Sequence, residues 1–365
     1  MSTRIGIVGL PNAGKSSLFN ALTRAGAQTG NYPFTTIDPN VAVVPVEDER
    51  LRAVGQTVGA SEIVFDTIDF HDIAGLIAGA HKGEGLGNRF LAHIRETDAI
   101  LHVLRAHEDP QVVHPEGSVD PVRDLEVVET ELALADLEVV ERRIGRVEKG
   151  ARGGDPQARE ELAWLQEVAA ALAAGRPARA VPPPPELSGA ARALGLITAK
   201  PVLLVANVAE GDGEVPAALA EAASQRGVPV VAISARAEAE LADFEAGEAQ
   251  ALRAELGLGE EAALARLIRE AFSLLGLIAF FTAGEGKPAQ SWHLPAGSTV
   301  YQAAGKIHTD IQKGFIRAEV IPWQELVEAG GWAAARERGL LRLEGREYLV
   351  HDGDVITVRF SPPSG

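Results

Sequence analysis

The sequence contains no cysteine and a single methionine, and no apolar run approaches the roughly 20 residues that span a bilayer. The absence of cysteine excludes disulfides, thiolate metal sites and cysteine nucleophiles. The first four residues lead directly into an apolar run, so we expect no signal peptide. We therefore expect a cytoplasmic protein with no membrane partner.

Basic residues are also scarce: 34 Lys and Arg stand against 51 Asp and Glu, a net charge of −17. This excess opposes binding to polyanions through the whole surface. The segment from Leu277 to the C-terminus is nearly balanced, with nine basic and ten acidic residues. Any RNA contact should therefore come from a local patch, and the C-terminal segment is the favoured one.

Apolar residues make up 46% of the 365 residues, enough to bury more than one core, so we expect two or three domains. One motif organises the chain. Residues 9–16 satisfy the G-x-x-x-x-G-K-[S/T] pattern, after the apolar run 5–8 and before a helix-like segment. This order of strand, loop and helix is typical of a phosphate-binding loop.

The chemistry of this loop suits a nucleotide with Mg²⁺. Its glycines let backbone N–H groups point inward, the helix N-terminus adds its positive end, and Lys15 brings a cation to the outer phosphates. Ser16 offers a hydroxyl to Mg²⁺. We expect nucleotide contacts from Asn12, Ala13, Gly14, Lys15, Ser16 and Ser17.

Two further stretches have the order and spacing of a nucleotide switch. In the loop 30–36, Thr36 is expected to give its hydroxyl to Mg²⁺ and its N–H to the γ-phosphate. At the end of a predicted strand, 64–70, the D-x-x-G sequence places Asp72 to hold a Mg²⁺-bound water. The Gly75 N–H is then expected to reach the γ-phosphate.

Leu76 stands where many GTPases carry the glutamine that orients the attacking water. Leucine cannot hydrogen-bond water, so hydrolysis must be slow, use another residue or await a partner. His81, in the Gly-rich stretch 80–88, is the polar candidate for that role. The alternative is a solvated histidine in a loop.

A helical insertion follows the predicted strand 100–104. Asp120-Pro121 predicts a helix start, and apolar residues recur at three–four spacing through Val139 and again from Leu162 to Leu172. The break at 153–156 indicates an antiparallel helical hairpin. Most of its charges are expected to form a solvated face.

After a buried strand at 201–206 comes Asn207-Val208-Ala209-Glu210, where a GTPase carries N-K-x-D. The Asp of that motif accepts both guanine N1–H and N2–H₂, and the longer Glu210 does not sit in the same place. Guanine preference should be weakened or lost. A strand at 230–233 then delivers Ser234 to the expected base-side loop.

The rest of the chain predicts helices around 237–256 and 260–275, then a mixed pattern. A strand at 277–282, a helix from about Ser298 or Thr299 and a stretch from 345 to 360 with a turn at Asp352-Gly353 indicate a compact α+β module.

These motifs together resemble the YchF / Obg-like ATPase family of P-loop proteins over essentially the whole chain. The matching stretches are 9–16, 31–36, 72–76, 82–88, 117–121 and 207–210. The resemblance implies an α/β P-loop domain (1–119 and 200–276), an inserted helical coiled-coil domain (120–199) and a C-terminal TGS domain of the ubiquitin-like β-grasp type (277–365).

The resemblance also implies ATP binding in preference to GTP, slow hydrolysis with Mg²⁺, and association with ribosomes. The base contacts would come from Asn207, Val208, Glu210 and Ser234, with Val208 acting through its backbone. RNA binding through the TGS domain is a further possibility. Two alternatives stay open: a GTP-specific Obg-type ribosome-assembly GTPase, and a non-enzymatic ribosome or RNA-binding scaffold stabilised by nucleotide.

Overall fold

The computed structural model describes residues 3–28, 40–73, 86–244, 246–256, 258 and 262–361. The chain forms two compact units. The first consists of Met1–Val44 and Ile68–Ala271, and the second of Pro45–Thr67 and Phe272–Gly365. The second unit therefore starts close to the expected boundary at 277 but also includes 45–67, which the sequence analysis assigned to the nucleotide-binding domain.

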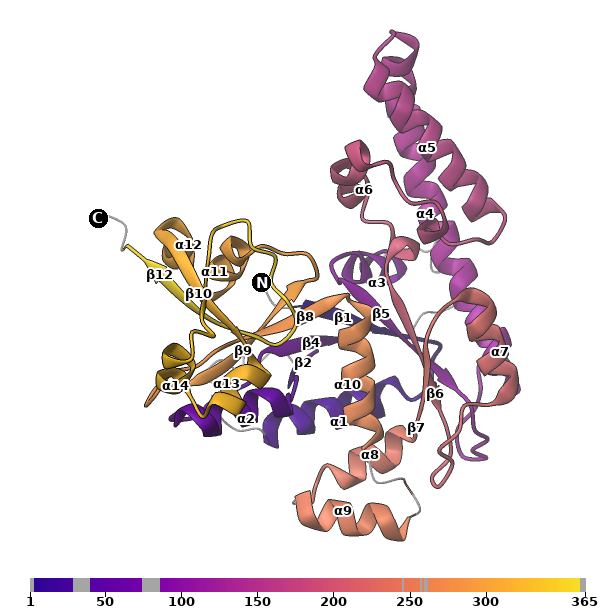
Figure 1. Cartoon of the computed structure of the whole chain (residues 1–365). Helices are drawn as coiled ribbons and strands as arrows, with labels where there is room; N and C mark the ends of the chain where they lie inside the picture. Colours follow the sequence, from indigo (N-terminus) through magenta and orange to yellow (C-terminus); the bar gives the residue numbers. More distant parts are fainter. Residues whose placement is uncertain are drawn as a thin grey trace. The chain divides into compact units, whose positions relative to one another are not determined.

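The first unit is built on a six-stranded sheet with the order β2-β4-β1-β5-β6-β7 (Figure 1). Strand β1 pairs in parallel with β4 and β5, β5 pairs in parallel with β6, and β6 pairs in parallel with β7. The carboxyl ends of these strands therefore meet at one edge, the usual ligand side of such a sheet. The strands are β1 (Thr3–Val8), β2 (Val41–Pro45), β4 (Thr67–Asp72), β5 (Ala99–Arg105), β6 (Val202–Asn207) and β7 (Val230–Ile233).

Helices cover this sheet because its central strand is buried along its whole length, with apolar side chains on both faces. Ile100 packs in one core cluster with residues of α3 and α4, and Leu104 lies on the same side, in a cluster with residues of α4 and α7. The helices of this unit outside the insertion are α1 (Lys15–Gln28), α3 (Leu86–Arg95), α7 (Ala217–Arg226), α8 (Ala235–Leu241), α9 (Ala246–Glu255) and α10 (Ala263–Leu274). Where one helix was predicted over 237–256, the structure has two, α8 and α9.

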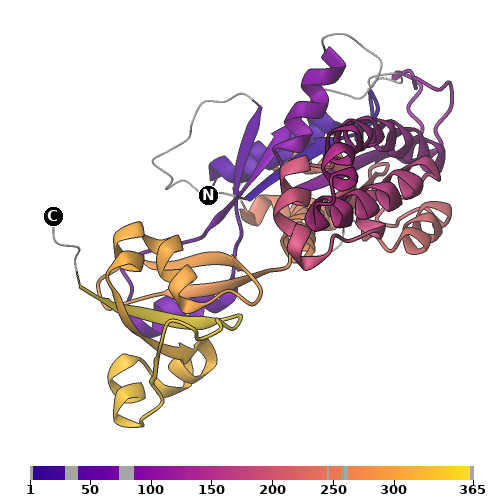
Figure 2. The ribbon, with the colours of Figure 1, turned by 90° about the horizontal axis from the view of Figure 1, so that it is seen from above.

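Residues 121–199, here called the helical arm, contain α4 (Pro121–Arg152), α5 (Pro156–Ala173) and α6 (Ser188–Leu194). The Asp120 carboxylate accepts hydrogen bonds from Val122 N and Arg123 N, which confirms the predicted helix start. Gly153 and Gly154 end α4, and α5 returns alongside it in both views (Figure 1 and Figure 2). Short 3-10 helices at Ala178–Ala180, Pro185–Leu187 and Ile197–Ala199 complete the arm.

A fully buried carboxylate anchors the arm to the rest of the first unit. Asp136 accepts hydrogen bonds from Ile197 N (3.0 Å) and from the N and Oγ1 of Thr198 (2.7 and 2.8 Å). Arg95 Nη1, from α3, lies 3.1 Å from the same carboxylate. These four donors satisfy the buried charge and tie α4 to the chain that re-enters the sheet.

The second unit is a mixed sheet with the order β11-β10-β12-β8-β9-β3, in which β12 runs parallel to β8 and antiparallel to β10. Its strands are β3 (Ile63–Val64), β8 (Leu277–Thr282), β9 (Ala289–Pro295), β10 (Phe315–Pro322), β11 (Arg342–Glu344) and β12 (Asp354–Phe360). Its helices are α2 (Glu49–Val58), α11 (Val300–Ile307), α12 (Thr309–Lys313), α13 (Trp323–Ala329) and α14 (Trp332–Glu337). Thr299 caps α11 in a capping box with Gln302, which confirms the helix start predicted there.

Packing explains why 45–67 belongs to this unit. One face of the sheet packs against α11, and the other packs against α2, α13 and α14. Leu51 and Val54 of α2 are fully buried in the core cluster on the face covered by α2, α13 and α14, which also contains Phe281 of β8. Removing α2 would expose this apolar face, so the helix is part of the second core.

The strand predicted over 64–70 is wrong as a single strand, because Asp66 divides it into β3 and β4. The Asp66 carboxylate accepts hydrogen bonds from Thr67 N (3.0 Å) and His293 N (2.9 Å), and Asp66 N donates to Ser291 Oγ (2.8 Å). These contacts with β9 replace strand pairing at this residue.

Candidate nucleotide site

The phosphate-binding loop has a backbone that only glycine permits at two positions. Gly9 and Gly14 have φ angles of 154° and 101°. A Cβ at Gly9 would lie 2.3 Å from the Val103 carbonyl oxygen, and one at Gly14 would lie 2.2 Å from Asn207 Nδ2. The two glycines of the motif therefore let the loop pass close to β5 and β6.

Lys15 is the first residue of α1 and is only 8% exposed. Its Nζ donates to the Leu10 carbonyl oxygen at 2.8 Å. Burial lowers the pKa of Lys15, and the negative charge of Asp72 opposes that shift. The ammonium is thus held inside the loop, where a phosphate would supply the negative charge it lacks.

Asp72 is the last residue of β4. It pairs in register with Ile7, the last residue but one of β1. Burial raises the pKa of this half-buried carboxyl, and the positive charge of Lys15 opposes the shift. The predicted Mg²⁺ ligand and the predicted phosphate-binding lysine therefore affect each other electrostatically at the same sheet edge.

A cavity of about 670 Å³ opens at this edge. It takes residues from the phosphate loop, the segment after β5, the end of β6 and the loop after β7. Its lining includes Asn12, Gly14, Lys15, Ser16, Ser17, Arg105, His107, Glu108, Asp109, Pro110, Gln111, Val112, Asn207, Val208, Ala209, Glu210, Ser234 and Arg236. Nearly all predicted nucleotide contacts among the described residues line this one cavity; the exceptions are Ala13, which is buried in the loop, and Asp72.

Asn207 connects the two ends of the cavity. Its Nδ2 donates to the Ala13 carbonyl oxygen at 3.0 Å, and its Oδ1 accepts from Ala235 N at 3.1 Å. The side chain, 6% exposed, thereby holds the phosphate loop against the start of α8. Ser234 caps that helix, accepting from Ala237 N at 3.4 Å.

Val208 and Glu210 differ in how they meet the cavity. Val208 N donates to the Ile233 carbonyl oxygen at 3.0 Å, and its side chain is buried. The remaining main-chain group of Val208 is its carbonyl, a hydrogen-bond acceptor. Glu210 is exposed and lines the cavity.

The segment after β5 is part of the cavity wall, which sequence reasoning missed. Arg105, 2% exposed, donates to the carbonyl oxygens of His107 (3.1 Å), Asp109 (3.2 Å) and Val112 (3.0 Å). Asn12 Nδ2 donates to the next carbonyl oxygen, that of Val113 (3.0 Å). An arginine ending a buried strand and followed by a polar, Pro-containing segment was the available signal.

The wall segment is also joined to the helical arm. His114 Nε2 lies 2.8 Å from Asp124 Oδ2, and both side chains are buried. Glu116 N donates to His114 Nδ1 at 3.2 Å. The first turn of α4 is therefore fixed to the chain that rims the cavity.

Four predicted residues lie outside the described part of the chain: Thr36, Gly75, Leu76 and His81. Within the described part there is no group of three or more His, Cys, Asp or Glu side chains placed to hold a metal. The oxygen donors that are present fit Mg²⁺, because Mg²⁺ is usually held by one or two protein ligands together with phosphates and water. Ser16 lines the cavity and is exposed, and Asp72 lies at the same edge.

No helix in the described ranges combines the length and the apolar character that crossing a membrane requires. The long helix α4, for example, carries charged residues along its whole length.

A phosphate loop between β1 and α1, with an aspartate ending the neighbouring parallel strand, defines a P-loop nucleotide-binding protein of the GTPase type. A family model described as "50S ribosome-binding GTPase" matches residues 4–134. The model YchF-GTPase_C, described as "Protein of unknown function (DUF933)", matches residues 277–361.

Full-length relatives identify the family. The chain is 46% identical to the "Ribosome-binding ATPase YchF" of Bacillus subtilis over 99% of this chain and 100% of the relative. Identity is also 46% to the protein of that name in Escherichia coli O157:H7, with the same coverage, and 41% in Mycoplasma genitalium, with 98% of each covered. The chain belongs to the YchF family.

A solved structure agrees with this result. The structure of the Schizosaccharomyces pombe YchF GTPase matches with a TM-score of 0.87 at 33% identity, covering 98% of each chain. The predicted family is confirmed. The predicted combination of an α/β P-loop domain with a separate C-terminal domain is confirmed as well.

Proposed function

We propose that this protein is a Mg²⁺-dependent ATPase that acts as a slow conformational switch in association with the ribosome. The ATPase activity and the ribosome association are named for the bacterial relatives. The observation that carries the choice of ATP is the wall of the cavity at 207–210.

The base preference follows from hydrogen-bond chemistry. Val208 N is engaged with Ile233, so the main-chain group left to meet a base is the Val208 carbonyl. An acceptor suits the 6-amino group of adenine and is mismatched to the 6-oxo group of guanine. Glu210 stands where the shorter aspartate of guanine-specific relatives would be, and the Asn207 side chain already bridges Ala13 and Ala235.

The phosphate end follows from charge. Lys15 is a buried cation with a lowered pKa, and negative phosphate oxygens would stabilise its charged form. The amides of Gly14 to Ser17 would supply uncharged donors around the same phosphates. Mg²⁺, when bound, would neutralise developing negative charge on the phosphates, with Ser16, Thr36 and Asp72 as the assigned holders.

The remaining roles rest on the sequence. Thr36 and Gly75 would order their loops against the γ-phosphate, which makes those loops the moving parts of the switch. Leu76 offers no hydrogen bond to water, so intrinsic hydrolysis is expected to be slow, and His81 is the residue assigned to position the attacking water.

Calorimetry with non-hydrolysable ATP and GTP analogues on nucleotide-free protein tests the base assignment. We expect the ATP analogue to bind about tenfold more tightly, the value of one matched against one mismatched hydrogen bond. Glu210→Asp should narrow the difference in affinity between the two analogues. Glu221→Asp, at an exposed residue of α7 outside the cavity, is a matched control that should leave this difference unchanged.

Tighter binding of the GTP analogue would instead favour an Obg-type GTPase, in line with the word GTPase in the description of the yeast structure. Binding of either analogue without hydrolysis, even with ribosomes present, would favour a nucleotide-stabilised scaffold.

A further inference from the structure

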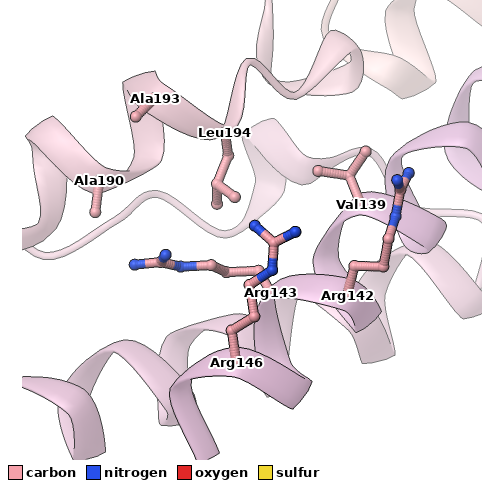
Figure 3. A pocket seen from close by; sticks show the side chains of 7 residues that line it. All are labelled: Val139, Arg142, Arg143, Arg146, Ala190, Ala193 and Leu194. Atoms are coloured by element: carbon pink, nitrogen blue, oxygen red, sulfur yellow. The ribbon is translucent and has the colours of Figure 1, made fainter. Parts of the chain in front are cut away.

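A second cavity, of about 330 Å³, lies on the helical arm, between α4 and α6. Figure 3 shows three arginine side chains from α4 and, across from them, small apolar side chains of α6. Its wall consists of the arginines Arg142, Arg143 and Arg146 and the apolar residues Val139, Ala190, Ala193 and Leu194. No acidic side chain lines it.

These arginines are incompletely neutralised. Arg143 Nε lies 2.6 Å from Glu161 Oε1 of α5, a good ion pair. Arg142 has two long contacts with the exposed Glu138: its Nη2 lies 3.4 Å from a carboxylate oxygen, and its Nε donates to the carbonyl oxygen at 3.4 Å. Arg146 has no ion-pair or hydrogen-bond partner among the residues that the structure describes. Like charges four residues apart on a helix repel, so this arrangement is unusual in a chain of net charge −17.

The cavity is held in shape by a packed core. Leu187 and Leu196, on either side of α6, are buried in one cluster with Trp164 and Leu165 of α5, and Leu194 packs against that cluster. Trp164 Nε1 donates to the Val181 carbonyl oxygen at 3.1 Å, which fixes the chain that leads to α6. Packing within the arm therefore holds the apolar wall and the arginines facing each other.

We propose that this cavity binds phosphate groups of an RNA backbone. The guanidinium group is planar and always charged, and its paired donors match phosphate oxygens in geometry as well as charge. Residues 142, 143 and 146 lie within about one helical turn, which suits a ligand with closely spaced charges. The proposal extends the proposed ribosome association by naming a surface for it.

The lining favours RNA over an acidic peptide. A peptide would bring backbone N–H donors, which require acceptors when buried. The lining side chains offer none, since arginine only donates and the other residues are apolar. Phosphate and ribose oxygens are chiefly acceptors, and Ala190, Ala193 and Leu194 provide an apolar surface for the sugar carbons.

The test is fluorescence anisotropy of the full chain with a labelled RNA hairpin over a range of salt concentrations. We expect Arg146→Ala to weaken binding about tenfold, as for loss of one charge-assisted hydrogen-bonded contact. The slope of log affinity against log salt should fall by about 1. Arg152→Ala is the matched control: it removes the same charge from the same helix at a side chain that is 76% exposed and outside the cavity.

Three outcomes would overturn the site. The first is no hairpin binding by the unaltered protein at low salt. The second is an equal effect of Arg146→Ala and Arg152→Ala, since only the total charge of α4 would then matter. The third is displacement of the hairpin by polyglutamate at equal charge concentration, which would indicate an acidic protein partner.

Co-sedimentation with ribosomes and ATP hydrolysis, measured alongside, separate this site from the proposed function. Arg146→Ala should weaken sedimentation and leave basal hydrolysis unchanged. If the unaltered protein binds the hairpin through Arg146 but does not sediment with ribosomes, the cavity is supported and the ribosome association is contradicted.

Discussion

Two pairs of charged side chains, Lys15 with Asp72 in the first unit and Arg50 with Asp352 in the second, have pKa shifts in opposite directions. Around the phosphate loop, burial lowers the pKa of Lys15 and raises the pKa of Asp72, so each charge is disfavoured where it lies. In the second unit, hydrogen bonding to Asp48 raises the pKa of Arg50. Burial would raise the pKa of Asp352, but Arg50 and the Ala279 N–H outweigh it and lower that pKa. The first pair would be stabilised by the proposed phosphate ligand, whereas the second pair is stabilised by hydrogen bonds within the unit.

The largest test of this contrast is Lys15→Met. We expect ATP hydrolysis to fall at least about 100-fold, because the cation that meets the outer phosphates is lost. We expect no decrease in the thermal midpoint, because the substitution removes a charge that burial disfavours. Steady-state phosphate release and thermal unfolding measure the two effects.

Lys200→Met is the control for that variant. Burial also lowers the pKa of Lys200, whose Nζ donates to the Arg95 carbonyl oxygen, outside the nucleotide cavity. Hydrolysis should be unchanged. If Lys200→Met lowers hydrolysis as much as Lys15→Met does, the loss comes from removing any buried lysine of the first unit and not from removing a phosphate-binding cation.

A smaller effect is expected on the folding stability at acidic pH. Burial, with a further contribution from the Lys15 charge, lowers the pKa of His102 to about 3 from 6.5. The folded state therefore keeps His102 neutral, while the unfolded chain takes up a proton below pH 6.5. Stability is unaffected above that pH and falls as the pH drops from 6.5 towards 3, by about 2 kcal/mol at pH 5.

His102→Leu should remove this loss, since leucine suits a site lined by Ile100, Leu132 and Ile197. Unfolding followed by circular dichroism at pH 7.5 and pH 5 measures it. His93→Leu, at an exposed histidine on α3 of the same unit, should keep the acid sensitivity of the unaltered protein. Equal acid sensitivity of the two variants would contradict the role of His102.

The smallest effect is expected in the second unit. Arg50→Met removes contacts with Asp48 and Asp352 (2.7 and 2.6 Å) and should lower the stability of that unit by about 1 kcal/mol. Hydrolysis should not change. Tryptophan fluorescence reports on this unit, which contains Trp292, Trp323 and Trp332 of the four tryptophans in the chain.

Arg52→Met, on the same helix, is the matched control. Its guanidinium pairs with the more exposed Glu47 and Glu49, so a change within about 0.5 kcal/mol is expected. A larger loss of stability from Arg52→Met than from Arg50→Met would contradict a stabilising role for the partly buried ion pairs of Arg50.

Local sequence was enough to predict the phosphate-binding edge. Gly9, Gly14 and Lys15 are fixed by a short motif, and Asp72 and Asn207 end apolar runs that became two strands of the same sheet, β4 and β6. In a parallel sheet the carboxyl ends of all strands lie at one edge, so a polar residue at the end of an apolar run could be placed at that edge from the sequence.

What could not be predicted depends on contacts between distant segments. The place of α2 depends on Leu51 being buried in the same core cluster as Phe281, more than two hundred residues away, and the break at Asp66 depends on Ser291 and His293. The cavity wall after β5 depends on Arg105 bonding three carbonyl groups, which no spacing rule encodes. The roles of Thr36 and His81 remain predictions.

The length of α4 has a mechanical consequence. Its 32 residues extend about 48 Å as one hydrogen-bonded rod. Near its N-terminus, Asp124 is hydrogen-bonded to His114 at the rim of the nucleotide cavity. Further along the helix, Asp136 accepts a hydrogen bond from Ile197 N. If α4 moves as a rigid body, a tilt of about 5° about Asp136 would displace its far end by about 2 Å.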